Sequence, residues 1–219
     1  MVAGNRRAFE DAMQTATSLA WEGKWEEAVQ SYEEALTHVP DSVDALTGMG
    51  MALFSLGREE DALGAYVRAS ELEPGEPVIV ERVGKALAQL GRRREAAEAF
   101  VRCGKQYLDV QGAPRLAAKS FEAAVAADPE CVEARASLLK HYQRHGQLSE
   151  AVQECLALAR IYRNDGRVDY AVRVCQHGLE LSPRHAEVRA MLDELRHDAD
   201  QAGDVVSESE GAVDISGGG

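Results

Sequence analysis

Two histidines at helical spacing come nearest to a metal site in this chain. His141 and His145 stand four residues apart in the segment HYQRH, so both rings would project from one face of a helix. A zinc-protease motif carries glutamate directly after its first histidine, whereas Tyr142 follows His141 here. No third ligand stands out, and His145 precedes Gly146, where a positive charge suits the end of a helix. We therefore expect no metal site.

Motifs for catalysis and cofactor binding are also incomplete. Gly48 and Gly50 form a G-x-G, but the third glycine of a dinucleotide-binding loop is missing and both residues fall within a predicted helix. Serines and histidines are scattered, and no strand-based scaffold is present that would fix a nucleophile beside a base. We predict a non-enzymatic protein without cofactors.

The cysteines have no CxxC pair, so their spacing suits neither a zinc site nor a disulfide framework. Cys103 and Cys175 fall at positions that need a small or medium apolar side chain in the repeat described below. We expect them to be reduced packing residues, as buried free cysteine usually is. The four are Cys103, Cys131, Cys155 and Cys175.

Three consecutive arginines, Arg92, Arg93 and Arg94, begin a predicted helix. Acidic side chains suit this position better, because the start of a helix carries a partial positive charge. The cluster could bind an acidic motif of a partner or of the chain's own tail. The alternative is a solvated turn. We keep the three arginines as candidate partner-binding residues.

Composition favours an α-helical protein, because Ala, Leu, Glu and Arg dominate its 219 residues and β-branched runs are almost absent. The net charge of −13 makes nucleic acid an unsuitable partner for the whole surface. No apolar stretch approaches the ~18 residues of a membrane span, and no secretory signal is apparent, so we expect a cytoplasmic protein. The charge is uneven: residues 1–76 hold 5 basic and 15 acidic side chains, whereas residues 77–127 hold 9 and 5.

Residues 43–76 contain the unit that the chain repeats. Gly57 divides it into two amphipathic helices, and the acidic residues that follow Gly57 suit the start of the second one. Pro74 ends the second helix. Two short helices cannot bury both apolar stripes between themselves, so this unit needs neighbours of the same kind. The first stripe consists of Leu46, Met49, Gly50, Leu53 and Leu56, and the second of Ala62, Ala65, Tyr66, Ala69 and Leu72.

Several landmarks recur every 34 residues across three such units. A helix–turn–helix unit of this length, with small residues where helices cross and proline at its close, resembles the tetratricopeptide repeat. The resemblance implies an all-α, right-handed α-solenoid. The tryptophan that is usual in the first helix of this repeat is replaced here by the apolar residues Ala12, Leu46 and Val80. The landmarks are Gly23, Gly57 and Gly91; Pro40 and Pro74; Ala28, Ala62 and Ala96; Tyr32, Tyr66 and Phe100; Ala35, Ala69 and Cys103; and Ala16, Gly50 and Gly84.

After Gly91 the repeat period lengthens to 54 or 55 residues, which indicates units of three helices with a long middle one. The helix near 93–110 fits the pattern of a second helix through Phe100 and of a first helix through Val101 and Leu108. It is therefore either shared between two repeats, with a bend or altered superhelix near 93–112, or inserted beside an ordinary repeat. Eleven helices are predicted in all, near 9–22, 25–38, 43–56, 59–72, 77–90, 93–110, 114–127, 132–145, 148–164, 168–181 and 185–199.

The predicted helices divide the chain into three segments. Residues 1–8 are predicted to be a frayed leader, and residues 9–199 form the solenoid, whose last helix, about 185–199, is polar on one side as a terminal cap must be. Residues 200–219 are acidic and Gly-rich, and are predicted to be a disordered tail or a linker.

Proteins of the tetratricopeptide-repeat type generally bind a peptide or helix in a concave groove lined by first helices. Trp21, Met51 and Phe54 would then be exposed apolar anchors; the alternative is that Trp21 and Phe54 are half-buried packing between repeats. The groove residues that the resemblance implies are Glu10, Met13, Thr17 and Trp21, then Asp44, Thr47, Met51 and Phe54, and finally Glu81, Lys85 and Ala88.

These expectations describe a scaffold or adaptor that binds a basic or amphipathic protein segment. Chaperone-binding members of the family hold a partner's terminal carboxylate with Lys and Asn, but Met13, Thr17, Thr47 and Met51 occupy those places here, so this clamp is absent. The alternative is a chaperone of secreted or assembly proteins, since acidic secretion chaperones with three repeats look similar over residues 9–110. The helices that follow do not fit that group.

Overall fold

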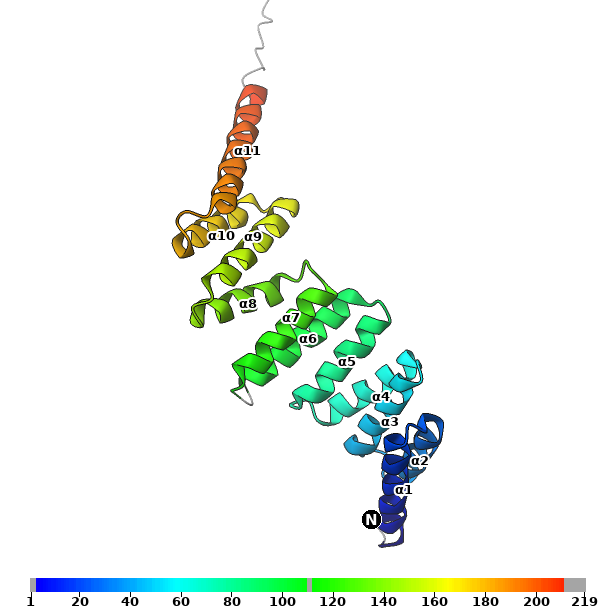
Figure 1. The fold of residues 1–219 in the computed structure, drawn as a ribbon. Coiled ribbons are helices and arrows are strands. Elements are labelled where there is room, and N and C mark those ends of the chain that lie inside the picture. Colours follow the sequence, from blue (N-terminus) through cyan, green and yellow to red (C-terminus); the bar gives the residue numbers. More distant parts are fainter. Residues whose placement is uncertain (1–2, 110–111, 211–219) are drawn as a thin grey trace, which may run out of the picture. The chain divides into compact units, whose positions relative to one another are not determined.

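A computed structural model describes residues 3–109 and 112–210 (Figure 1). Within these residues the fold is all-α, with eleven helices and no strand. The chain divides into two compact units, one up to Ala134 and one from Arg135 on. The helices are α1 (Ala3–Trp21), α2 (Trp25–His38), α3 (Val43–Ser55), α4 (Glu59–Leu72), α5 (Pro77–Gln89), α6 (Arg93–Asp109), α7 (Pro114–Ala127), α8 (Val132–Arg144), α9 (Leu148–Asn164), α10 (Val168–Leu181) and α11 (Ala186–Glu210).

The predicted helix map is confirmed in number and order, and two outer boundaries need correction. Helix α1 begins at Ala3, so most of the predicted leader is helical, and Arg6 contacts Glu10 one turn later at 3.0 Å. Helix α11 continues to Glu210, because no proline interrupts the sequence, so the predicted tail is helical over residues 200–210. The rest of the predicted tail, residues 211–219, lies outside the described residues.

The turn between α3 and α4 depends on glycine in the left-handed region. Gly57 has a φ of +70°, where any other residue would be strained. The N–H of Arg58 donates to the carbonyl of Leu53 at 3.0 Å, and the N–H of Gly57 donates to that of Phe54 at 3.1 Å. These two bonds form a Schellman motif, which satisfies the last carbonyls of α3 and reverses the chain into α4.

Small residues of one helix face aromatic rings of the next. A Cβ on Gly50 of α3 would lie 2.6 Å from Cε1 of Tyr66 in α4, and a Cβ on Gly84 of α5 would lie 2.8 Å from Cε1 of Phe100 in α6. Neither glycine has room for a methyl group without displacement of the ring. The predicted close approach of helices at these positions is therefore confirmed.

Helix α6 takes part in two such contacts. Towards α5 it supplies the ring of Phe100, as a second helix does. Towards α7 it supplies Gly104, on which a Cβ would lie 2.5 Å from Cε1 of Phe121. The glycine is the contribution of a first helix, so the geometry favours a helix shared between two repeats over an inserted one.

In the second unit, α9, α10 and α11 enclose one core. Ion pairs between α9 and α11 reinforce it, from Arg160 to Glu187 at 2.5 Å and from Arg163 to Glu194 at 3.2 Å. Helix α11 contributes four core side chains, and its role as a terminal cap stays a prediction. The buried core consists of Val152, Leu156, Ala159, Ala171, Cys175, Val188, Met191, Leu192 and Leu195.

Candidate binding groove

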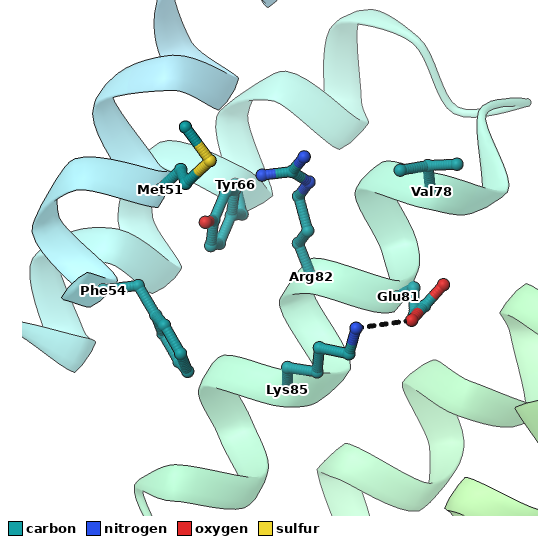
Figure 2. Close-up of a pocket in the computed structure, with 7 residues that line it drawn as sticks. All are labelled: Met51, Phe54, Tyr66, Val78, Glu81, Arg82 and Lys85. Carbon is teal, nitrogen blue, oxygen red and sulfur yellow. Dashed lines mark ion pairs between the residues drawn. The ribbon is translucent and has the colours of Figure 1, made fainter. Parts of the chain in front are cut away.

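A pocket of about 290 Å³ lies between α3 and α5 in the first unit (Figure 2). Met51 and Phe54 reach it from α3, four and one residues before the end of that helix at Ser55. Helix α4 contributes the ring of Tyr66. The α5 side chains repeat at three-and-four spacing, which places them on one face of that helix. They are Val78, Glu81, Arg82 and Lys85.

Charged groups surround the apolar centre of this pocket. Lys85 Nζ lies 2.6 Å from Glu81 Oε1, so these two charges offset each other. The guanidinium of Arg82 lies over the ring of Tyr66, 5.9 Å from its centroid, in a cation–π contact (Figure 2). Burial raises the pKa of Tyr66, and Arg82 opposes this rise, so the phenol remains protonated at neutral pH. Met51 remains 37% exposed and is accessible to a ligand.

Three further pockets join the first through shared residues. Met51 also lines a pocket of about 420 Å³ that includes Thr17 and Trp21, and another of about 480 Å³ that includes Asp44 and Thr47. Glu81 and Lys85 also line a pocket of about 310 Å³ against α6 and α7, together with Leu116 and Lys119. We call these four joined pockets the main groove.

The charge along the main groove is not uniform. Near the N-terminal ends of α3 and α5 its lining carries Asp44, Glu73 and Glu76. Glu76 also caps α5, because its carboxylate accepts the N–H of Val78 at 3.3 Å. Towards α7 the lining carries Lys119. A ligand would therefore meet acids at one end of the groove and a base at the other.

Most of the site residues predicted from the sequence come together in this groove. Trp21 is 88% exposed, while Phe54 is half-buried. Glu10, Met13 and Ala88 do not line it, and the three arginines lie elsewhere: Arg92 lines a different groove, and Arg93 and Arg94 are exposed. The predicted residues that do line it are Thr17, Trp21, Asp44, Thr47, Met51, Phe54, Glu81 and Lys85.

Some residues that line the groove are not among those predicted from the sequence. Val78 and Arg82 precede and follow Glu81 on one face of α5, and this spacing is the signal that could have identified them. Tyr66 was assigned to packing alone, yet it both covers Gly50 and lines the groove. Lys119 belongs to α7, whose face could not be assigned until the role of α6 was known.

His141 and His145 do lie together, with ring centroids 4.3 Å apart. Among the described residues, however, no group of three His, Cys, Asp or Glu side chains could hold a metal ion. None of the described helices combines the length and apolar character that crossing a membrane requires.

Comparison with known families gives two matches to models of the tetratricopeptide repeat. One covers residues 13–77, which include α2, α3 and α4, and the other covers residues 111–175. No curated protein matches the sequence significantly.

Solved structures with a similar fold include the TPR2B domain of yeast Sti1 in a complex with pHsp70. It is 18% identical, with a TM-score of 0.50, and the match covers 55% of this chain and 98% of that one. PilF of Pseudomonas aeruginosa is 16% identical, with a TM-score of 0.41 and coverage of 89% and 99%. MamA from Desulfovibrio magneticus RS-1 is 20% identical, with a TM-score of 0.41 and coverage of 72% and 96%.

Proposed function

Since this chain belongs to the tetratricopeptide-repeat family, we propose that it is a non-enzymatic scaffold that binds a segment of a partner protein in the main groove. The segment is an extended peptide or a helix, with an apolar side chain for the pocket between α3 and α5 and basic residues for the acidic end. The fold supports a role in protein–protein interaction in general, and the groove is the basis for the finer proposal.

The observation that carries this proposal is the position of Met51. Its side chain lines three of the four joined pockets and is still 37% exposed. Trp21 on one side and Val78 on the other add exposed apolar surface, at 88% and 43%. Apolar side chains that remain accessible within a concave surface are typical of the residues that contribute most to binding a partner.

Affinity capture with single variants tests the groove. Met51→Glu places a charge at the junction of three pockets and should abolish capture of the partners bound by the wild-type chain. Ser55→Glu is the matched control, because Ser55 is exposed one turn later on α3 and lines none of the described pockets. Circular dichroism of both variants should match the wild type. Equal capture by Met51→Glu and the wild type would refute the proposal.

The alternative function, a chaperone of secreted or assembly proteins, is less well supported. That resemblance concerns residues 9–110, whereas the chain continues with α7 in the first compact unit and with a second compact unit from Arg135 on. A scaffold that holds one segment in a preformed groove accounts for Met51, Phe54 and Val78 without requiring an unfolded client.

A further inference from the structure

Both tryptophans of the chain line one of the four pockets of the main groove. This pocket of about 420 Å³ lies at the turn between α1 and α2, and Met51 of α3 joins it to the pocket between α3 and α5. We call it the aromatic pocket. Among the described residues, its lining includes three aromatic rings and no charged side chain. The rings belong to Trp21, Trp25 and Tyr32, and Thr17, Ala20 and Met51 lie around them.

The turn between α1 and α2 places the two tryptophans at this pocket. Gly23 has a φ of +74°, and its N–H donates to the carbonyl of Ala20 at 3.1 Å. The N–H of Lys24 donates to the carbonyl of Leu19 at 2.9 Å, which completes a Schellman motif like the one at Gly57. Trp21 is the last residue of α1 and Trp25 the first of α2, so the chain reverses between the two rings.

The three rings differ in how much of their surface is open. Tyr32 is 3% exposed and is held in place by Gly48 of α3, where a Cβ would lie 2.6 Å from Tyr32 Cε1. Trp25 is half-buried, and Trp21 is 88% exposed. The pocket therefore has a fixed base and an open wall. A charged group bound there can touch the rings and still keep part of its hydration, which lowers the cost of taking it from water.

The cations of the chain itself leave these rings open. Arg82 lies over the ring of Tyr66, and Arg167 lies over that of Tyr170. Within the described residues, however, no Lys or Arg lies over Trp21, Trp25 or Tyr32. Lys24 is the nearest base in the sequence, and its Nζ pairs instead with Glu22 Oε2 at 2.7 Å. The faces of these rings carry partial negative charge, so they are available to a cation from a partner.

The charge around the aromatic pocket is strongly acidic. Residues 1–76 hold 5 basic and 15 acidic side chains. Four of the five bases already form ion pairs with acids of the same region, and these are Arg6, Lys24, Arg58 and Arg68.

Unpaired acids lie close to the rings. Glu26 and Glu27 follow Trp25 directly in α2 and form no ion pair within the described part of the chain. Asp44 lines the adjoining pocket, which Met51 shares with the aromatic one. A cation in the aromatic pocket is therefore attracted by the rings and by the surrounding acids, whereas an anion is repelled and a neutral apolar group gains nothing from the acids.

We propose that the aromatic pocket binds an arginine side chain of the partner segment, stacked on Trp21 and Trp25. This inference rests on the proposed function and names the residue that enters this part of the main groove. Arginine suits the rings better than lysine does, because its planar guanidinium stacks on aromatic faces and is less strongly hydrated than an ammonium group. Met51 joins the two pockets, so the segment carries its arginine close to the apolar side chain that enters between α3 and α5.

Selection from a phage-displayed library of random peptides on the full-length chain tests this site. Peptides of the main groove are those that bind Phe54→Ala about tenfold more weakly, since Phe54 lines the pocket between α3 and α5 but not the aromatic pocket. They should be enriched in arginine and should shift the fluorescence emission of the two tryptophans. Replacement of the peptide's arginine by citrulline, a neutral side chain of the same shape, should lower the affinity measured by fluorescence anisotropy about tenfold.

Trp21→Leu removes one ring and keeps an apolar side chain at an exposed position. On this variant the citrulline replacement should cost about threefold or less, because the double-mutant cycle isolates the contact between ring and cation. Tyr170→Leu is the matched control: it removes a ring that is 44% exposed in the second compact unit, and it should leave both affinities unchanged. Circular dichroism of each variant should match the wild type.

Equal binding of the arginine and citrulline peptides to the wild type would overturn the proposal, because the occupant would then be a neutral group. An equal citrulline loss on the wild type and on Trp21→Leu would also overturn it, since the arginine would then lie away from this ring, for example beside Asp44.

Main-groove peptides that leave the tryptophan emission unchanged would refute this inference alone and leave the proposed function standing. Arginine peptides that depend on Trp21 but not on Phe54 would support this inference and contradict the proposed extent of the main groove. The absence of any enriched peptide would overturn both.

Discussion

The ring of Phe121 covers Gly104 at the crossing of α6 and α7, where a Cβ on the glycine would lie 2.5 Å from Cε1 of the ring. One turn earlier on α6, Phe100 covers Gly84 of α5 in the same way. Two such contacts on one helix join consecutive repeats without a separate helix between them. The lengthened repeat period after Gly91 follows from this arrangement.

The first prediction concerns this crossing. Gly104→Val should force the ring of Phe121 out of position and lower the free energy of unfolding by about 1–3 kcal/mol, the usual cost of overpacking a close contact. The midpoint of urea unfolding measures the loss.

Gly64 provides the matched control. It lies in α4, and a Cβ there would meet no atom within 4 Å. Gly64→Ala should stabilise the chain by about 0.5–1 kcal/mol, because alanine restricts the unfolded backbone. If Gly104→Val unfolds at the same urea concentration as the wild type, the close contact does not exist in solution.

Much of the fold could be predicted because its signals are local. Glycine at 23, 57 and 91 takes a positive φ in each turn, and the periodic stripes between these positions determine which helix faces are buried. The two helix ends that were misplaced, at Ala3 and Glu210, have no such marker. The role of α6 could not be decided, because Phe100 and Gly104 suit two different partners until both contacts are seen.

The candidate site was less predictable for a different reason. Met51 and Phe54 follow from the position of first helices in the repeat. Arg82 depends on a contact between repeats, because its guanidinium packs on Tyr66 of the preceding one. Arg92 lies outside the main groove. Its side chain pairs with Glu95 and lines a different pocket, together with residues of α4.

A second prediction concerns a partly buried ion pair of the second unit. Arg135 Nη1 lies 2.9 Å from Glu154 Oε2, with side-chain exposures of 15% and 14%. Glu154→Leu leaves the arginine without this partner and should destabilise the unit by about 1–3 kcal/mol. The double variant Arg135→Met/Glu154→Leu should recover most of that loss in urea unfolding. Equal stability of the single and double variants would show that the pair does not couple the two residues.

A third prediction concerns the salt dependence of binding in the main groove. A peptide with a basic segment should bind more weakly as salt rises, because exposed charges are screened beyond about 8–10 Å at physiological salt. The change should appear in the association rate. Asp44→Asn and Glu73→Gln should flatten this dependence, whereas Glu33→Gln, on exposed α2 surface outside the groove, should not. A dependence that is the same in all three variants would place the basic segment elsewhere.

A final prediction concerns two buried cysteines and alkaline pH. Burial raises the pKa of Cys155 and of Cys175 to about 11 from the ordinary value of 9.0, and for Cys155 the nearby Cys175 adds to the rise. The folded state therefore keeps both protons to a higher pH than the unfolded state does. It follows that the stability due to these thiols is complete below pH 9 and is lost as pH rises towards 11, by on the order of 2 kcal/mol for each thiol.

Other groups also titrate in this range, so the comparison is with Cys155→Ala/Cys175→Ala, in which their contribution is retained. Urea unfolding should show a steeper fall in stability between pH 9 and 11 for the wild type than for the double variant. Parallel curves for the two chains would mean that these thiols are not buried as neutral groups.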